Sequence, residues 1–168
     1  MIVLHLEPLT TAAFAPFGEV VECEGAQHYP INQGFAERFD DLARVDTLRQ
    51  GGETNVSLCT AEPRPLPIAI AMMERHPLGS QLFFPLEARG WLVVVGGDGM
   101  RPANLQAFRA GGHQGVNYRR NVWHHPLLVL DRGSRFLIVD RKGPGDNLEE
   151  ISLASEEIIV EVGRGIGN

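Results

Sequence analysis

The sequence predicts a single, mostly β domain built as a sandwich or a small barrel. Glycine (19 residues) and proline (11 residues) are spread along the 168-residue chain and separate short apolar runs, as expected for strands joined by turns. These turn signals recur at intervals of roughly 8–12 residues, which is typical of all-β sandwiches and barrels. Stretches with helical periodicity are scarce, and no internal repeat or low-complexity linker divides the chain.

Each expected strand is a short apolar or alternating run bounded by turn residues. Two short helical segments are expected, one at 10–18 that Gly18 ends, and one at 35–45 with apolar residues at 35, 39 and 42. The domain is predicted to cover residues 1–168, with a flexible tail at 163–168. The predicted strands are 2–7, 18–23, 54–61, 66–76, 80–86, 91–96, 105–110, 115–120, 124–130, 134–141 and edge strands within 149–162.

Composition and charge narrow the possible partners. Hydrophobic residues make up 43% of the chain and charged residues 21%, which indicates a globular protein, and the net charge of −6 argues against nucleic acid or an anionic membrane as the main partner. No run reaches 18 apolar residues, and the first ten residues do not have the pattern of a signal peptide. Cys23 and Cys59 lack a CxxC spacing, so we expect two small buried thiols and a cytoplasmic protein.

Two clusters of residues could carry chemistry. In the first, Glu74 and His76 lie two residues apart and would share one face of a strand, and Gln81 follows after a Pro-Leu-Gly turn. The second contains the adjacent pair His124 and His125, whose side chains would point to opposite faces of a strand. We therefore expect His124 to point inward as a ligand or proton-transfer group, and His125 to face outward, toward a dimer partner or in a supporting role.

The order of these clusters resembles the two motifs of the cupin superfamily, an H-x-H-x4-E strand pair and a later G-x-x-H. In that family the motifs hold a divalent metal inside a small jelly-roll barrel. The resemblance implies metal ligation by Glu74, His76, Gln81 and His124, with Glu in place of the first His and Gln in place of the Glu. These oxygen and nitrogen donors suit a metal such as Ni²⁺ or Mn²⁺, although Gln is a weak ligand.

Longer stretches resemble the ureidoglycolate lyase family, namely "INQGFAERFDDLA", "ERHPLGSQ", "GVNYRRNVWHHPL" and "FLIVDRKGPGDN". The resemblance begins at "PLTTAAFAPFGEVVE" and covers nearly the whole chain. It implies a cytoplasmic homodimer with a cupin-like jelly-roll β-barrel and a few short helices. It also implies cleavage of (S)-ureidoglycolate to glyoxylate and urea in allantoin (purine) breakdown, with which Ni²⁺ has been associated.

This chemistry needs a base for the hydroxyl proton, an acid for the departing urea nitrogen and a cation for the substrate carboxylate. His124 or His76 would act as the base, with Glu74 orienting an imidazole; a bound metal could instead hold the hydroxyl and carboxylate.

A bidentate arginine suits the carboxylate of the substrate. Arg75 would face away from the site by strand parity. The remaining candidate substrate contacts are Arg38 (unless it pairs with Asp40 or Asp41), Arg119 or Arg120, Tyr118, Gln81, and Asn32 with Gln33 near the ureido group.

Three other functions remain open from the sequence. A ureidoglycolate amidohydrolase would use the same residues to activate water and would release ammonia and carbon dioxide. A non-catalytic cupin would bind a small carboxylate, and a structural dimer module would explain the apolar runs at 91–96 and 127–130 but not the histidines. Polar donors in apolar surroundings favour catalysis, and the reaction products would separate the lyase from the amidohydrolase.

Overall fold

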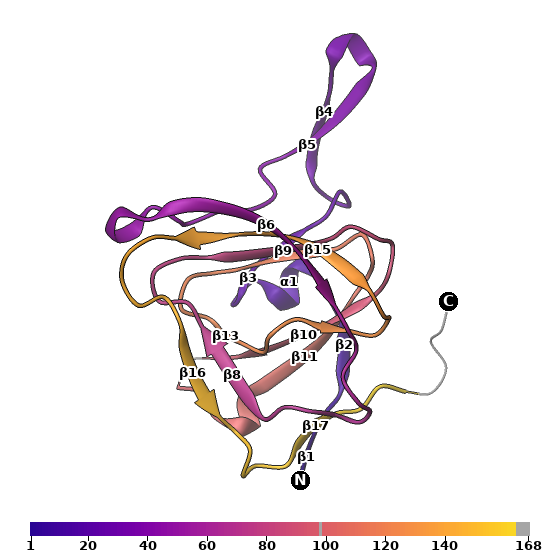
Figure 1. Cartoon of the computed structure of the whole chain (residues 1–168). Helices are drawn as coiled ribbons and strands as arrows, with labels where there is room; N and C mark the ends of the chain where they lie inside the picture. The colour runs from indigo at the N-terminus through magenta and orange to yellow at the C-terminus, as the bar shows by residue number, and fades with distance from the viewer. Residues whose placement is uncertain (98, 164–168) are drawn as a thin grey trace.

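Two β-sheets face each other in the computed structural model, which describes residues 1–97 and 99–163 (Figure 1). The first sheet has the order β16 (Glu149–Ser152), β8 (Met72–Arg75), β13 (Trp123–His124), β10 (Trp91–Gly96), β11 (Leu105–Ala110), β2 (Leu6–Pro8), and β14 (Leu128–Val129) also pairs with β10. The second sheet has the order β3 (Gly18–Val21), β12 (Gly115–Tyr118), β9 (Gln81–Pro85), β15 (Ser134–Lys142), β6 (Glu53–Ala61).

Two smaller sheets and four short helices complete the described structure. One small sheet has the order β1 (Ile2–Leu4), β17 (Ile158–Val160), β7 (Ile68–Ala69), and the other is the hairpin of β4 (Gln27–Ile31) and β5 (Ala36–Asp40). The helices are α1 (Thr11–Phe14) and the single 3₁₀ turns Asn32–Gly34, Arg49–Gly51 and Pro102–Asn104. The predicted mostly β fold with a few short helices is confirmed, and its two large sheets face each other.

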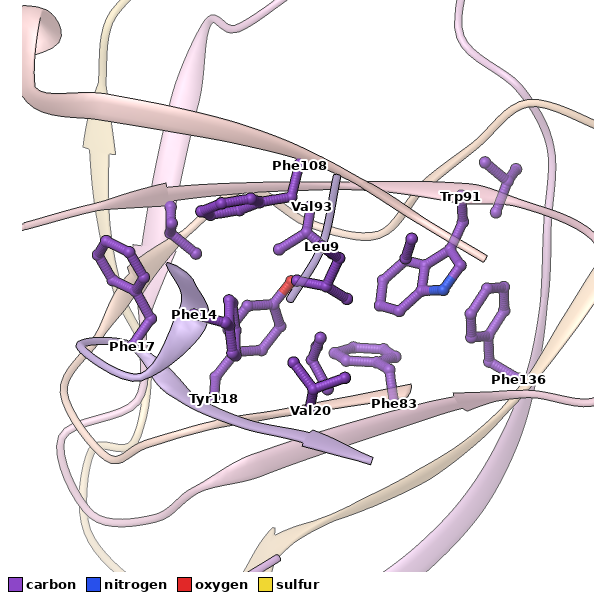
Figure 2. Packing of buried hydrophobic residues seen from close by; sticks show 14 residues of the cluster. Leu9, Phe14, Phe17, Val20, Phe83, Trp91, Val93, Phe108, Tyr118 and Phe136 are labelled. Carbon is purple, nitrogen blue, oxygen red and sulfur yellow. The ribbon is translucent and has the colours of Figure 1, made fainter. Parts of the chain in front are cut away.

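An aromatic core fills the space between the two large sheets (Figure 2). Phe14, fully buried on α1, packs edge-on against Phe108 of β11, with their ring centroids 6.0 Å apart. The Thr10 hydroxyl caps α1 by accepting a hydrogen bond from the Ala13 amide. Each fully buried side chain of this size contributes roughly 1.5–3 kcal/mol of hydrophobic stabilisation. The core members from β9, β10, β12 and β15 are Phe83, Trp91, Val93, Val95, Val116, Tyr118 and Phe136.

The first sheet is covered on both faces. Successive residues of β10 alternate between the aromatic core and a second core, to which β1, β7 and β17 contribute Leu4, Ile68, Ile158 and Val160. All six residues of β10 are buried for this reason. Burial on both faces explains why the sequence of β10 is a continuous apolar run instead of an alternating one.

The predicted helix at 35–45 is wrong, because Ala36–Asp40 forms β5, paired in register with β4. Cross-strand contacts favour the hairpin: His28 donates to Glu37 and the Tyr29 hydroxyl donates to Asp40. The apolar residues at 35 and 39 therefore do not lie on one face of a helix. Phe35 is instead the exposed tip of this hairpin.

Several other predicted segments are shorter or divided, among them the strand 2–7, which is divided into β1 and β2, and the strand 115–120, which ends at Tyr118. The predicted strand 66–76 is divided into β7 and β8, and the predicted strand 124–130 into β13 and β14, with Pro126, which has no amide N–H to donate, between the latter two. Helix α1 ends at Phe14, and Gly18 instead begins β3 with φ +158°. A Cβ at Gly18 would lie 1.9 Å from the Asn117 carbonyl oxygen, so the close approach of β3 and β12 requires glycine.

Both cysteines were predicted to be buried, and the prediction is wrong for Cys23. Cys23 is exposed, whereas Cys59 is partly buried beside the aromatic core, and burial raises the pKa of the Cys59 thiol. Among the described residues, no helix is long and apolar enough to cross a membrane. Most of the predicted tail, residues 164–168, lies outside the described residues.

Candidate active site

Glu74, His76 and His124 form a cluster in which one donor atom from each side chain lies within 4.8 Å of the others. Strand pairing creates this arrangement, because Glu74 of β8 lies directly opposite His124 of β13 in an antiparallel register. His76 follows β8 immediately and lies two residues from Glu74, on the same side. The His124 side chain is 2% exposed, and those of Glu74 and His76 are each 16% exposed, so the cluster reaches solvent only at its edge.

Backbone carbonyls fix which nitrogen of each imidazole is free. His76 Nδ1 lies 2.7 Å from the Asn147 carbonyl oxygen, and His124 Nδ1 lies 3.0 Å from that of Val122. A carbonyl oxygen only accepts hydrogen bonds, so both Nδ1 atoms must carry and donate the proton. When a ring is neutral, its lone pair lies on Nε2 and is directed into the cluster; when His124 is protonated, its Nε2–H can instead donate to Glu74 Oε1 or Gln81 Oε1.

The second sheet contributes two more residues to the cluster. Gln81 of β9 and Tyr118 of β12 are cross-strand neighbours. The Gln81 Oε1 atom lies 3.1 Å from His124 Nε2, and the Tyr118 ring stacks on the His124 ring with centroids 4.2 Å apart and an interplanar angle of 10°. The site therefore bridges both large sheets, and the predicted grouping of Gln81, Tyr118 and His124 is present.

Electrostatics keep the Glu74 carboxyl ionised and the Tyr118 phenol neutral. Burial alone would raise the pKa of Glu74, but the hydrogen bond from His124 and the nearby imidazoles outweigh burial and leave its pKa below the ordinary value. Burial, and then the negative charge of Glu74, raise the pKa of Tyr118. Tyr118 is therefore a neutral aromatic packing surface beside His124, and not a base.

A tight turn between β12 and β13 joins the two histidine segments. Asn121 adopts φ 72°, a left-handed conformation that asparagine tolerates, and its amide donates to the His76 carbonyl oxygen at 2.9 Å. The Val122 amide donates to the Arg119 carbonyl oxygen, which closes the turn. The same turn supplies the Val122 carbonyl that orients His124. It interrupts the strand that parity arguments would extend from Tyr118 to His124.

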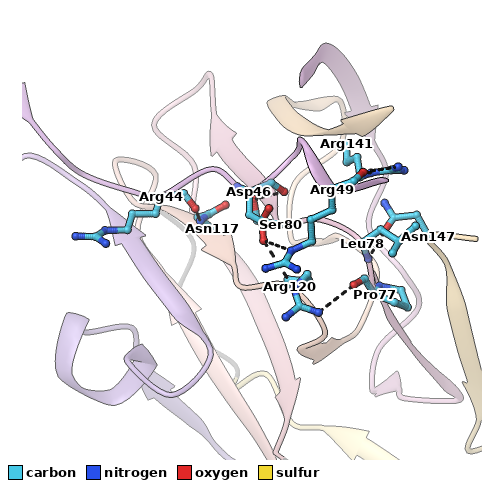
Figure 3. Close-up of polar contacts among 10 residues, drawn as sticks. All are labelled: Arg44, Asp46, Arg49, Pro77, Leu78, Ser80, Asn117, Arg120, Arg141 and Asn147. Atoms are coloured by element: carbon cyan, nitrogen blue, oxygen red, sulfur yellow. Dashed lines mark hydrogen bonds and ion pairs between the residues drawn. The ribbon is translucent and has the colours of Figure 1, made fainter. Parts of the chain in front are cut away.

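Asn147 is a positioning residue that sequence reasoning missed. Its backbone carbonyl accepts a hydrogen bond from His76 Nδ1. Its side-chain Oδ1 accepts a hydrogen bond from the Leu78 amide at 2.8 Å (Figure 3). The only signal for it was its place after a Gly-Pro-Gly-Asp turn. A contact between residues 71 positions apart cannot be inferred from such a turn.

The prediction that His125 faces outward is wrong, because its side chain is 2% exposed. The His125 amide donates to the Val94 carbonyl and its Nδ1 donates to the Pro126 carbonyl at 2.7 Å. Burial lowers the pKa of His125 to about 4, so the ring is neutral near pH 7. Its Nε2 atom has no hydrogen-bond partner among the described residues.

The arginines predicted to bind substrate have different positions. Arg120 lies at the rim of the site, where it donates to the carbonyl of Pro77, the residue after His76, at 3.2 Å; it also lies 3.7 Å from the Asp46 carboxylate (Figure 3). Arg119 is exposed and contacts Glu19. Arg75 faces away, as parity predicted: its guanidinium lies over the Trp123 ring and pairs with Glu149.

Arg38 and Asn32 do not join this cluster within one chain. Both are exposed on the β4–β5 hairpin, which projects from the barrel (Figure 1). Arg38 donates to Asp40 at 3.0 Å, which is the salt bridge considered as the alternative from the sequence. Asn32 and Gln33 adopt φ 51° and 58° in the turn at the hairpin tip. Within one copy, the contacts of Arg38 and the turn at Asn32 lie on the hairpin, and the roles of these two residues as substrate contacts stay predictions.

The donor set fits a divalent metal. Glu74 Oε1, Gln81 Oε1 and the Nε2 atoms of His76 and His124 converge, with His124 Nε2 3.5 Å from Glu74 Oε1. His76 Nε2 is buried and has no hydrogen-bond partner within residues 1–97 and 99–163. Metal ligands at bond lengths of about 2.1 Å lie roughly 3–4 Å from each other, close to these separations. Histidine ligands whose other nitrogen donates to a backbone carbonyl are typical of metal sites.

Comparisons with known proteins show the family of this chain. The family model for ureidoglycolate lyase matches residues 1–161. A ureidoglycolate lyase from Burkholderia cepacia is 54% identical over 153 residues, covering 90% of this chain and 86% of that protein. One from Rhizobium etli strain CIAT 652 is 52% identical over 159 residues, covering 94% of this chain and 96% of that protein. A solved 3,4-ketoisomerase from Campylobacter jejuni superposes with a TM-score of 0.46 at 10% identity, covering 76% of this chain and 86% of that chain. The chain belongs to the ureidoglycolate lyase family.

Proposed function

We propose that this protein is a ureidoglycolate lyase that cleaves (S)-ureidoglycolate to glyoxylate and urea. The observation that carries the proposal is the convergence of His76 Nε2, His124 Nε2 and the Glu74 carboxylate in one nearly enclosed site. Family membership supplies the substrate, since the matching relatives are named for this activity. The cluster supplies groups that can accept, hold and return a proton.

The reaction needs no activated water. Ureidoglycolate carries a carboxylate, a hydroxyl and a ureido nitrogen on one carbon, so loss of the hydroxyl proton allows a C=O bond to form as the C–N bond breaks. The departing nitrogen then takes up a proton to give urea. The same proton can make both transfers, which leaves atoms and charge balanced.

The two histidines suit these proton transfers. His76 Nε2 has a free lone pair, and the Asn147 carbonyl holds its ring in the required tautomer. Glu74 stays ionised and lies 4.0 Å from His76 Nε2 and 3.5 Å from His124 Nε2. Its charge would stabilise either ring once protonated. We place the base role on His76 or His124 and the orienting role on Glu74.

Substrate binding would use groups at the rim of the cluster. Arg120 lies beside Pro77 and would pair with the substrate carboxylate, for which its planar guanidinium is suited. Gln81 offers an amide to the ureido group, and the Tyr118 ring forms the wall behind His124.

A divalent metal such as Ni²⁺ would be held by Glu74, His76, Gln81 and His124. When bound, it would supply Lewis-acid chemistry, lowering the pKa of the substrate hydroxyl. The imidazoles would then act as ligands, and Glu74 would provide the negative charge that balances the ion. Removing the metal therefore distinguishes a role of the histidines as metal ligands from a role as proton-transfer groups.

We further propose that the protein is a homodimer that acts in the cytoplasm, in allantoin (purine) breakdown. Exposed Cys23 is compatible with a reducing compartment. The exposed apolar side chains Val56 and Leu58 on β6 support association of copies.

The test is a product assay. The purified protein is given racemic ureidoglycolate as isolated, after chelation, and after chelation followed by Ni²⁺, and urea, ammonia and glyoxylate are quantified separately. We expect equal amounts of urea and glyoxylate and no ammonia. Ammonia in place of urea would establish the amidohydrolase, and no turnover in any condition would leave a carboxylate-binding protein. Activity that is lost on chelation and returns with Ni²⁺ would assign the histidines as ligands.

A further inference from the structure

One carboxylate and two arginines meet at the rim of the candidate active site. Arg49 donates from Nε to Asp46 Oδ2 at 3.0 Å, and Arg120 Nε lies 3.7 Å from the same oxygen atom (Figure 3). The two guanidinium groups are therefore neighbours on a single carboxylate. We call Asp46, Arg49 and Arg120 the rim group. Because two positive charges share one negative charge, the rim group has one unbalanced positive charge.

The rim group lies directly beside the residues that form the histidine cluster. Arg120 donates to the backbone carbonyl of the residue that follows His76. Two hydrogen bonds join Asp46 to Ser80, the residue before Gln81: the Asp46 amide donates to the Ser80 hydroxyl, and the Ser80 amide donates to the Asp46 carbonyl, each at 2.8 Å. A small ligand in contact with His76 and Gln81 is therefore within reach of the arginines.

Buried side chains hold the segment that carries Asp46 and Arg49. The side-chain amide of Asn117, which is 1% exposed, donates to the Arg44 carbonyl oxygen at 3.0 Å. The buried guanidinium of Arg141 donates to the Arg49 carbonyl oxygen from Nε at 3.0 Å and from Nη2 at 2.8 Å. The backbone on both sides of Asp46 is thus anchored, so its short side chain loses little conformational freedom when it contacts the two arginines.

Both arginines keep hydrogen-bond donors for a ligand. Arg49 contacts Asp46 through Nε, whereas Arg120 directs Nε to Asp46 and Nη1 to a carbonyl. Within residues 1–97 and 99–163, the Nη2 atom of Arg120 and both Nη atoms of Arg49 have no hydrogen-bond partner. The two side chains are 37% and 53% exposed, respectively. Free guanidinium N–H groups at a solvent-accessible rim suit a carboxylate.

We propose that the rim group selects ligands that carry a single carboxylate. Arg49 and Arg120 together bind the substrate carboxylate, and Asp46 is a positioning residue that holds both arginines and limits the net charge of the rim group to one. Ureidoglycolate carries one carboxylate, so its charge balances the rim group. A second carboxylate on the ligand is repelled by Asp46. This inference rests on the proposed function and deepens it.

The roles of Asp46 in charge and in positioning can be separated. Asp46→Asn keeps the size of the side chain and removes its charge, and the bonds to Ser80 stay because they use the backbone of Asp46. The repulsion that is removed acts once on a monoanion and twice on a dianion, whereas a loss of arginine positioning weakens both ligands alike. The ratio of the two affinities therefore measures the charge effect alone.

The first test uses two probes that differ by one carboxylate. Glycolate has the hydroxyl and carboxylate of the substrate, and tartronate has a second carboxylate in place of the ureido group. Isothermal titration calorimetry of the protein as isolated measures both dissociation constants without turnover. We expect Asp46→Asn to shift their ratio by ~10-fold in favour of tartronate, the size expected for a nearby, partly screened unit charge. Asp46→Glu keeps the charge and should keep the wild-type ratio.

The second test removes the additional arginine. Arg49→Gln should weaken glycolate binding by ~10-fold, as for loss of a charge-assisted hydrogen bond. It should raise the KM for ureidoglycolate by a similar factor and leave kcat nearly unchanged, because the carboxylate is bound equally before and during bond cleavage. Glu87→Gln and Arg135→Gln are the matched controls. These two residues form an ion pair, and Glu87 lies beyond the opposite end of β9 from Gln81, so neither change should alter glycolate or tartronate binding.

The outcomes separate this inference from the proposed function. An unchanged ratio in Asp46→Asn would overturn the charge role of Asp46, and unchanged glycolate affinity in Arg49→Gln would overturn the second contact. Absence of glycolate and tartronate binding to the wild type would overturn both. A protein that releases no urea but shows the Asp46-dependent ratio would overturn the lyase function and support selection of a single carboxylate by the rim group. Circular dichroism verifies that each variant is folded.

Discussion

Two histidine–glutamate pairs in the described part of the chain, His28–Glu37 and His124–Glu74, differ in their surroundings, and the pair with the shorter distance has the smaller effect on chemistry. On the β4–β5 hairpin, His28 Nδ1 lies 2.6 Å from Glu37, and both side chains are about half exposed. In the barrel, His124 Nε2 lies 3.5 Å from Glu74, and the histidine is almost completely buried. Exposed pairs contribute roughly 0–1 kcal/mol because water and salt screen them. Burial removes that screening, so the His124–Glu74 pair has the greater influence on proton transfer and metal binding, although its atoms lie further apart.

The difference also lies in what orients each ring. His28 donates its Nδ1 proton to Glu37 itself, so the pair satisfies itself. His124 donates Nδ1 to a backbone carbonyl, which leaves Nε2 for Glu74 and Gln81. A functional cluster in this fold therefore requires a supporting hydrogen bond behind each imidazole, and a short distance between two side chains is not sufficient.

The largest expected effect follows from removing the buried imidazole. His124→Ala deletes the ring that joins Glu74, Gln81 and Tyr118, and we expect kcat/KM to fall by ~10³-fold, within the range for loss of acid–base or metal-assisted catalysis. Steady-state assays of glyoxylate release measure the loss. His113→Ala, in an exposed turn, is the control. Retention of more than about a tenth of wild-type activity by His124→Ala would place the chemistry elsewhere.

A smaller effect is expected from neutralising each carboxylate of the two pairs. Glu74→Gln keeps the shape of the side chain but removes its charge, so we expect Ni²⁺ affinity to fall by ~10–100-fold. Glu37→Gln makes the same chemical change on the hairpin and should leave Ni²⁺ affinity unchanged. Isothermal titration calorimetry of the two variants compares them directly. Equal Ni²⁺ affinities in wild type and Glu74→Gln would exclude Glu74 as a ligand.

The smallest effect concerns the exposed pair. We expect His28→Ala to lower the free energy of unfolding by less than ~1 kcal/mol, as for other surface pairs. Urea denaturation at a fixed protein concentration measures the change, and the concentration is held constant because dimerisation contributes to stability. A loss above ~2 kcal/mol would show that the hairpin pair is coupled to a larger buried network.

The sequence by itself determined the features that depend on local spacing. Punctuated short runs predicted the mostly β fold, and the two-residue spacing of Glu74 and His76 placed both on one side of a strand. Parity also correctly excluded Arg75 from the site. Family resemblance then grouped His124 and Gln81 with them, and their side chains do meet. The predictions for Glu74, His76 and Arg75 hold because the alternation of side chains along a strand is a property of the backbone itself.

Only the tertiary structure decided the rest. His125 is buried, and its backbone amide and ring bond the carbonyls of Val94 and Pro126, which strand parity alone did not predict. Within the predicted helix 35–45, Ala36–Asp40 instead forms a hairpin strand through pairing with β4, and Arg38 pairs there with Asp40. Asn147 orients His76 from 71 residues away. Each outcome depends on which distant segment packs against a residue, and that is fixed by the whole fold's burial and hydrogen bonding rather than by neighbours in the sequence.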